Sequence, residues 1–397
     1  MKIALVSEQY PPDMGGVARS IERIAKNLNK AGLDIVVITY DYKKDDFFEE
    51  NLSATYINEE KNAKGFVIYR IGPISKNFKV LEPGLMASQR RNFYHAMLSV
   101  LDKEKPDLIH GFCTTKSGFF AVMAGKKLGI PSIVSVRGND ISRDVFDFSK
   151  FGAIKWTINN ASFITFVNDI SQEDGSYFID KDKRYKIVLN SCDFEHKELP
   201  EKDKVALKEK LGIKRDAFVI GFSGAIREKK GVQHLLEAFN RVAKEKTSAH
   251  LLIIGDFVKD LGNKPYQDYI EKNNLKHKVT LTGMVPFTEV DKYYNLIDII
   301  CMPSTNDGLS NSLLEGLKAG IPTIASNIFR GILEDNKHAL LFEVGNSKEL
   351  YDKIMILIGN SILRDLLSNN AKQLIKEKFS ADRETQEYIE IYKELLK

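Results

Sequence analysis

Residues 297–326, IDIICMPSTNDGLSNSLLEGLKAGIPTIAS, contain a complete strand, loop, helix and strand unit. Apolar runs at 297–302 and 322–325 predict two buried strands. Between them the sequence predicts a turn-rich loop over 303–310 and a helix over about 311–319. Two buried strands joined through a helix are typical of a parallel sheet with helices on its faces. This stretch therefore points to the α/β class.

The same alternation runs along the chain in two series. The first series has predicted strands at residues 2–7, 34–40, 66–72, 107–112, 132–138, 163–168 and 186–190. The second has them at 218–224, 250–256, 279–285, 298–304 and 322–326, and the chain is predicted to be helical after residue 347. A charged stretch, 191–215, separates the series, and the acidic segment 41–64 is predicted to be a mobile surface excursion. A length of 397 residues suits two domains, so we predict two doubly wound parallel sheets.

Composition narrows the class of protein further. The chain is 43% hydrophobic and 28% charged, and the apolar start at residues 3–6 is too short for a signal-peptide core, so we expect a cytoplasmic protein. Cys113, Cys192 and Cys301 are widely spaced and show no metal-ligand pattern. Residues 1–190 carry 27 Lys+Arg against 23 Asp+Glu, which accounts for the net charge of +4. No basic and aromatic interleaving points to nucleic acid.

The loop at 303–310 has the features of an anion or sugar site. Gly308 permits close backbone approach, and Ser310 or Asn311 can cap the next helix, whose first amide groups carry the positive end of the helix dipole. Asp307 lies just before this helix and Glu315 lies inside it, eight residues later. Both carboxylates are therefore expected to face one bound molecule.

The segment PSTNDGLSNSLLEGLKAGIP resembles the carboxylate-x7-carboxylate motif of retaining glycosyltransferases of family 4, which have the GT-B fold. The family usually has Glu at both ends, whereas Asp307 is the first carboxylate here. The resemblance implies that Glu315 holds the ribose of a nucleotide. It also implies that Asp307, the amides of Gly308, Leu309 and Ser310, and Asn311 lie near the donor sugar.

The resemblance covers nearly the whole chain and implies a domain division. Residues 1–192 would form a Rossmann-like acceptor domain, and residues 193–378 a Rossmann-like nucleotide-sugar donor domain facing it across a cleft. Residues 379–397 would form a helix that crosses back to the first domain, as the final helix often does in GT-B proteins.

The stretch GFSGAIREKKGVQHLLEAF, residues 221–239, places cations at a strand end beside a helix start. Sugar transfer from a nucleotide releases a diphosphate, whose developing charge requires fixed positive groups. The family pattern has Gly-Arg after the strand and Lys-Gly six residues later. Lys230 and Gly231 match it, whereas Ala225 stands where the Arg is usual, and Arg227 as its substitute is a hypothesis. The alternative is a solvated loop.

The first half contains looser matches. Gly15 and Gly16 follow the first strand and would let amides approach a donor phosphate or an acceptor, although paired glycines at such a turn are most often tight geometry. They do not form GxGxxG, so a nicotinamide enzyme is disfavoured. Many relatives have His-Gly at a position where this chain has Arg137, followed by glycine and Asn139. Either Arg137 binds an anionic acceptor or a leaving-group oxygen, or the acceptor class differs. His110 is the other candidate on this face, with a core position as its alternative.

We therefore predict a retaining, metal-independent hexosyltransferase-like enzyme of cell-envelope polysaccharide biosynthesis. It would move a sugar from a nucleoside diphosphate donor, UDP- or GDP-linked, to a glycan, lipid-linked or small-molecule acceptor, with no other cofactor. The Asp-x-Asp at residues 180–182 lies among lysines and is interpreted as a solvated loop. The alternatives are a nucleotide-sugar 2-epimerase of the same fold and a non-catalytic sugar-nucleotide-binding protein.

The predicted helix in residues 81–98 bears on location. Arg90 and Arg91 lie beside Phe93, Tyr94 and Met97, a combination that suits peripheral contact with the inner face of a membrane carrying a lipid-linked acceptor. The alternative is a helix packed in the usual way against the first sheet.

Overall fold

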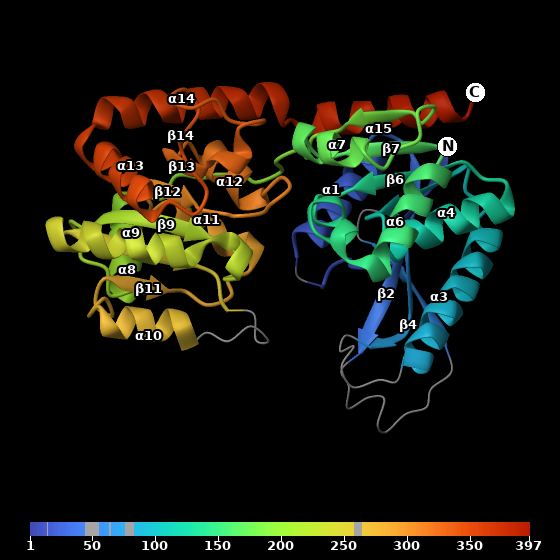
Figure 1. Cartoon of the computed structure of the whole chain (residues 1–397), viewed down its shortest axis with the longest axis horizontal. Helices are drawn as coiled ribbons and strands as arrows, with labels where there is room; N and C mark the ends of the chain where they lie inside the picture. The colour runs from blue at the N-terminus through green and yellow to red at the C-terminus, as the bar shows by residue number, and fades with distance from the viewer. Residues whose placement is uncertain (14, 44–54, 63–64, 76–82, 258–263) are drawn as a thin grey trace. The chain divides into compact units, whose positions relative to one another are not determined.

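The computed structural model describes residues 1–13, 15–43, 55–62, 65–75, 83–257 and 264–397 (Figure 1). The chain divides into two compact units. The first comprises Met1–Ser191 together with Ala381–Lys397, and the second comprises Cys192–Ser380. The division therefore falls between Ser191 and Cys192, and the last 17 residues belong to the first unit.

The first unit is built on an eight-stranded sheet of order β3-β4-β2-β1-β5-β6-β7-β8. The strands are β1 (Lys2–Ser7), β2 (Asp34–Lys43), β3 (Tyr56–Lys61), β4 (Val67–Ser75), β5 (Leu108–Phe112), β6 (Ser132–Val136), β7 (Phe163–Phe166) and β8 (Tyr185–Ile187). All neighbouring pairs are parallel except β3 and β4, which are antiparallel. The predicted surface excursion is thus partly wrong, because residues 56–61 form an edge strand. Residues 44–54 and 63–64 of that segment lie outside the described residues.

Helices cover both faces of this sheet. They are α1 (Gly16–Lys30), α3 (Pro83–Glu104), α4 (Ser117–Leu128), α5 (Asn139–Ser142), α6 (Phe148–Asn160), α7 (Asp169–Ser176) and α15 (Ala381–Leu395), with a 3-10 turn η1 (Asp144–Phe146). Alternate residues of a strand point to opposite faces. Accordingly Ile3 and Leu5 pack with α1 and α15, whereas Ala4 and Val6 pack with α3 and α4.

Phe93 and Met97 of α3, which the sequence suggested for membrane contact, are buried in the first unit. Phe93 and Met97 are fully buried and pack in the same cluster as Ala4 and Val6. They are therefore part of the core and do not face a membrane surface. No helix in the described part of the chain is both long enough and apolar enough to span a bilayer.

The second unit has a six-stranded sheet of order β11-β10-β9-β12-β13-β14, in which all neighbouring pairs are parallel. Its strands are β9 (Phe218–Ser223), β10 (Ala249–Ile254), β11 (Val279–Leu281), β12 (Ile299–Met302), β13 (Thr323–Ser326) and β14 (Leu340–Phe342). The two sheets confirm the predicted α/β fold. Strand β14 was not predicted, because three apolar residues carry no periodic signal.

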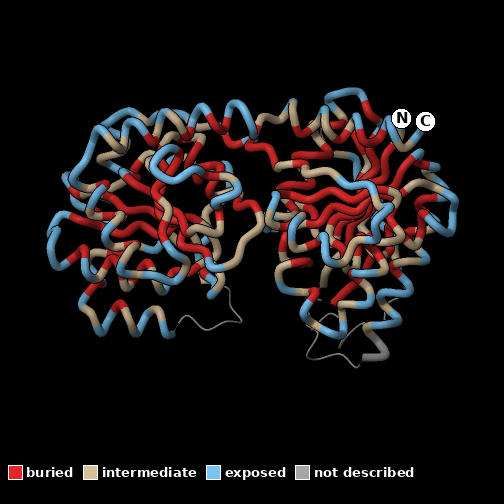
Figure 2. The backbone as a smooth tube through the Cα atoms, turned by 45° about the horizontal axis from the view of Figure 1, so that its top comes forward, coloured by how far each residue is buried: buried red, intermediate tan, exposed pale blue. Residues whose placement is uncertain are grey.

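The helices of the second unit lie on both faces of its sheet. They are α8 (Glu201–Lys210), α9 (Val232–Glu245), α10 (Lys264–Lys272), α11 (Phe287–Tyr294), α12 (Asn311–Ala319), α13 (Ser347–Gly359) and α14 (Ser361–Lys378), with 3-10 turns η2 (Glu228–Lys230) and η3 (Asn327–Phe329). Ile299 and Cys301 of β12 belong to the core beneath α9 and α13. The intervening Ile300 contacts Gly316 of α12 on the opposite face. In Figure 2 the central strands of both sheets are coloured as buried, and the helices alternate between buried and exposed positions.

A buried ion pair attaches the last helix to the first unit. Arg23 of α1 donates from Nε and Nη2 to the two carboxylate oxygens of Glu384 on α15, both at 3.0 Å. Ser191 Oγ also donates to Glu384 at 2.6 Å. Burial alone would raise the pKa of Glu384, but the charge of Arg23 and these hydrogen bonds lower it below its usual value. The carboxylate is therefore ionised and fully paired.

We predict that Glu384→Ala destabilises the first unit by about 3–5 kcal/mol, because it leaves the Arg23 guanidinium buried without its counter-charge. The chain's single tryptophan, Trp156, lies on α6 and reports on this unit by fluorescence during urea unfolding. Glu390→Ala is the control, since Glu390 pairs with Lys186 at an exposed position. Equal losses for the two variants would contradict the assignment.

Candidate functional site

The second sheet reverses its strand order next to β9. From β9 the chain builds β10 and β11 on one side, and it then returns to add β12, β13 and β14 on the other. In parallel α/β sheets ligands bind outside the carboxyl ends of the strands at such a reversal. The loops that leave β9 and β12, residues 224–231 and 303–310, both begin there.

Backbone contacts hold these two loops against each other. The amides of Thr305 and Asn306 donate to the Lys229 carbonyl at 2.8 and 3.4 Å. Gly231 has φ +65°, and a Cβ at this position would lie 1.9 Å from the Pro303 carbonyl oxygen. The close approach of the loops therefore requires glycine at residue 231.

A cation and a carboxylate meet where the loops join. Lys230 Nζ lies 2.5 Å from Asp307 Oδ2 and 3.5 Å from Ser310 Oγ. The Lys230 and Asp307 side chains are only 14% and 13% exposed. Each loop thus contributes one charge to a largely shielded pair, which lies at the start of α12.

The predicted capping of α12 by the Ser310 side chain is wrong. Ser310 occupies the N-cap position of α12, but its side chain makes no hydrogen bond to the helix amides. Its hydroxyl lies instead within reach of Lys230. Asn311 is already the first residue of the helix, Gly308 is half-buried, and Leu309 is buried. The positive end of the α12 dipole therefore lies next to the Lys230 ammonium and receives no hydrogen bond from the Ser310 side chain.

Glu315 lies nearly one and a half turns further along α12. Five residues separate it from Ser310, or about 7.5 Å along the helix axis. Helical side chains lean toward the N-terminus, so Glu315 leans toward the loop that carries Asp307. Glu315 is only 3% exposed, and the hydroxyl of Tyr294 donates to its Oε2 at 3.0 Å. The structure thus brings Lys230, Asp307 and Ser310 together at the start of α12, and Glu315 lies at the middle of the same helix.

Arg227 and Ala225 occupy the start of the same β9 loop. Arg227 immediately precedes η2 and is exposed, whereas Ala225 is half-buried. Arg227 is therefore three residues from Lys230 on the solvent side of the loop. Its proposed replacement of the family arginine stays a prediction.

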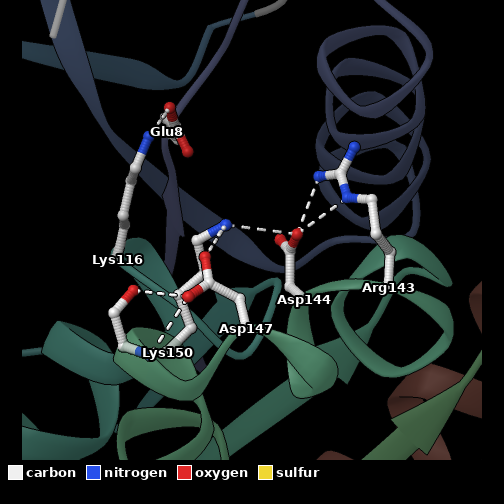
Figure 3. Close-up of polar contacts among 7 residues, drawn as sticks. Glu8, Lys116, Arg143, Asp144, Asp147 and Lys150 are labelled. Carbon is white, nitrogen blue, oxygen red and sulfur yellow. Dashed lines mark hydrogen bonds and ion pairs between the residues drawn. The ribbon is translucent and has the colours of Figure 1, made fainter.

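The carboxyl edge of the first sheet carries a charged network that the sequence analysis missed. Glu8, which follows β1, accepts hydrogen bonds from Lys116 Nζ and Tyr42 Oη, both at 2.5 Å. Nearby, Asp144 pairs with Arg143 and Lys150 (Figure 3). The position of Glu8 directly after β1 was the signal in the sequence, since the reversal of strand order between β1 and β5 lies here.

Gly15 and Gly16 begin α1 at this edge of the first sheet. Gly15 is the N-cap residue and Gly16 is the first residue of the helix. A Cβ on Gly15 would lie 3.1 Å from the Gln9 side chain. These contacts are those of a tight strand-to-helix turn, and a role for either glycine toward a phosphate stays a prediction.

His110 is a core residue and not an acceptor-facing one. It is fully buried, with Nδ1 2.8 Å from Tyr392 Oη and Nε2 2.7 Å from Ser135 Oγ. Burial, together with the nearby charge of Arg137, lowers its pKa to about 3. Its placement on the acceptor side is therefore corrected, because both ring nitrogens are used inside the first unit.

Arg137 follows β6 and is half-buried. Its Nη2 donates to Asn190 Oδ1 at 2.8 Å, and its guanidinium lies 5.9 Å from the centre of the Phe112 ring. Its Nη1 is buried and has no hydrogen-bond partner among the described residues. Asn139 starts the short helix α5 and is half-buried. The assignment of Arg137 and Asn139 to the acceptor side stays a prediction.

The two doubly wound units are those of a GT-B protein, and comparison with known proteins agrees. The family model of glycosyltransferase family 4 matches residues 14–193, and that of glycosyl transferases group 1 matches residues 203–374. The chain belongs to this family of glycosyltransferases, whose donors are nucleotide sugars.

Relatives match over almost the full length. An uncharacterized glycosyltransferase of Methanocaldococcus jannaschii is 26% identical, with 99% of this chain and 98% of the relative covered. The alpha-monoglucosyldiacylglycerol synthase of Acholeplasma laidlawii is 26% identical over 97% of this chain and 96% of its own. The crystal structure of Anabaena HepE in complex with UDP-glucose has a TM-score of 0.78 at 18% identity and covers 99% of this chain and 100% of that one. This last likeness concerns the fold.

We predict that the stability of the first unit falls as the pH drops below about 6.5, by up to about 1.4 kcal/mol per pH unit. The unfolded His110 binds a proton in this range, whereas the folded residue does so only near pH 3, so the unfolded state gains more protons. Urea unfolding followed by Trp156 fluorescence at pH 7, 6 and 5 measures the slope. His110→Gln should flatten it, and His95→Gln, at an exposed position on α3, should not. A slope unchanged in the His110 variant would contradict this.

A second prediction concerns Gly231. Gly231→Ala should lower the melting temperature more than Gly212→Ala, although both glycines have positive φ, +65° and +70°. The two variants share the backbone strain, of about 1–2 kcal/mol, but no atom lies within 4 Å of a Cβ at Gly212. Scanning calorimetry measures the difference. Equal shifts would show that the contact with Pro303 does not constrain the loops.

Proposed function

We propose that this protein transfers a sugar from a UDP- or GDP-sugar to a glycan, lipid-linked or small-molecule acceptor with retention of the anomeric configuration. The observation that carries the proposal is the meeting of Lys230, Asp307 and Ser310 at the start of α12, with Glu315 on the same helix. Retention follows from the family, and the donor and acceptor classes are inferences.

Lys230 and the α12 amides are the groups assigned to the diphosphate. As the bond between the sugar and the diphosphate breaks, negative charge grows on the leaving oxygen. A positive ammonium and oriented amides that are already in place stabilise this charge without reorganising. Asp307 supports this role, since its carboxylate holds the Lys230 ammonium at the helix start. Arg227 would add a second cation from the solvent side of the loop.

Glu315 is assigned to the ribose. A carboxylate accepts hydrogen bonds from two hydroxyl groups at once, which suits a vicinal diol. The distance of about 7.5 Å along α12 from Ser310 to Glu315 leaves room for a sugar ring between a phosphate and the carboxylate. Asp307, which lies closer to the helix start, would then face the transferred sugar. No second carboxylate is assigned as a nucleophile, so front-side displacement is the working mechanism.

The relatives support the donor and acceptor classes only by analogy. HepE was crystallised with UDP-glucose, and the name of the Acholeplasma enzyme describes the glucosylation of a diacylglycerol. UDP-glucose and a lipid acceptor are therefore the first substrates to test. No cofactor beyond the nucleotide sugar is proposed.

We expect Lys230→Ala to lower kcat by about 10²–10³-fold, because it removes a charge that acts in the transition state. Glu315→Gln should weaken donor binding about 10- to 100-fold, because it weakens hydrogen bonds to an ionised group. The donor is first found by thermal shift with UDP, GDP and their glucose conjugates, and transfer to diacylglycerol vesicles and simple glycans is then followed by NMR of the anomeric proton.

Lys276→Ala is the matched control, because Lys276 is 75% exposed and pairs only with Glu271 among the residues the structure describes. Wild-type transfer rates in the Lys230 and Glu315 variants would overturn these assignments. Conversion of the donor into an isomerised sugar without any acceptor would indicate a 2-epimerase instead. Tight donor binding with no turnover would indicate a binding protein.

A further inference from the structure

We propose that Tyr294 is a positioning residue, which orients the Glu315 carboxylate toward the nucleotide ribose and is itself held by the segment that begins the second unit. This inference rests on the proposed role of Glu315. It adds a residue that neither the sequence motif nor the family comparison indicates.

Tyr294 contacts Glu315 directly. Tyr294 ends α11, is 1% exposed, and donates from Oη to Glu315 Oε2 at 3.0 Å. A buried carboxylate is costly unless donors meet its oxygens, and a hydrogen bond to an ionised group is a strong one. Since a carboxylate is planar, fixing Oε2 also fixes the direction of Oε1. The side chain of Glu315 is thus set before any ligand arrives.

The ring of Tyr294 is held in place by Phe194. Phe194 lies edge-on to it, with ring centres 5.3 Å apart and an interplanar angle of 75°. Phe194 is itself buried and lies in the linker segment, which we define as residues 192–199. An edge-to-face pair restricts rotation of the ring about its side-chain bonds.

Polar contacts with Asp291 and Asn295 attach the linker segment to α11. Asp291 of α11 accepts a hydrogen bond from the Lys197 amide at 2.8 Å and contacts His196 Nδ1 at 2.6 Å. Asn295, just past the helix, accepts from the Leu199 amide at 2.8 Å. These contacts keep the segment alongside the helix that ends at Tyr294.

The same segment is also attached to α12. Lys318 Nζ donates to the Cys192 carbonyl at 3.0 Å, and Lys318 lies three residues beyond Glu315 on that helix. The linker segment therefore contacts both helices, and the Tyr294 to Glu315 bond closes the connection between them. The Tyr294 hydroxyl therefore has a role beyond the packing of its ring, because its bond to Glu315 connects α11 with α12.

The test compares nucleotides with and without ribose hydroxyls. Binding of UDP and GDP, each against its 2′,3′-dideoxy counterpart, is measured by calorimetry for the wild type, Tyr294→Phe, Phe194→Leu and Glu315→Gln. The wild type should prefer a ribose form at least tenfold, and Glu315→Gln should abolish this preference. Tyr294→Phe should reduce the preference at least threefold, while its affinity for the dideoxy form changes less than twofold. Phe194→Leu should act in the same direction, because it releases the Tyr294 ring.

Tyr293→Phe is the matched control, because Tyr293 is the neighbouring, half-buried tyrosine of α11. Its ribose preference should equal that of the wild type. If Tyr294→Phe weakens both forms equally, or neither, Tyr294 has only a packing role and the inference is overturned. If the wild type does not distinguish the two forms, or if neither nucleotide binds, the ribose assignment of Glu315 is itself wrong.

Discussion

Parallel strands leave a sheet at the same edge, and the reversal of strand order beside β9 therefore brings two loops together at that edge. Everything at the candidate site depends on this constraint. The β9 loop supplies Lys230, the β12 loop supplies Asp307, and α12 supplies Ser310 and Glu315. Gly231 makes the meeting possible, because any side chain there would collide with the Pro303 carbonyl.

The two carboxylates of the motif have different partners, which separates their roles. Asp307 faces an ammonium at the helix start, so its charge is balanced by a cation. Glu315 lies deeper and accepts a hydrogen bond from the neutral Tyr294 hydroxyl. A carboxylate is a strong acceptor for hydroxyl groups. This difference agrees with assigning Glu315 to the ribose.

The first unit depends on a contact between the two ends of the chain. Arg23 and Glu384 are 361 residues apart, and the first unit acquires α15 only after the whole second unit has been made. The same helix supplies Tyr392, which fixes His110. The sequence showed a helical pattern in residues 381–396, but it did not show that Glu384 would pair with an arginine of α1.

The sequence alone determined the order of strands and helices and the strand ends that carry chemistry, because both depend on local periodicity and on residues that follow apolar runs. Lys230, Asp307 and Glu315 were found in this way. Tertiary structure alone decided their partners: Lys230 bonds Asp307 across 77 residues, and Tyr294, which no motif marks, bonds Glu315. The tertiary structure also places His110 in the core, whereas the sequence suggested it as a site residue. Such pairings depend on which elements the folded sheet brings together, and that information is spread over the whole chain.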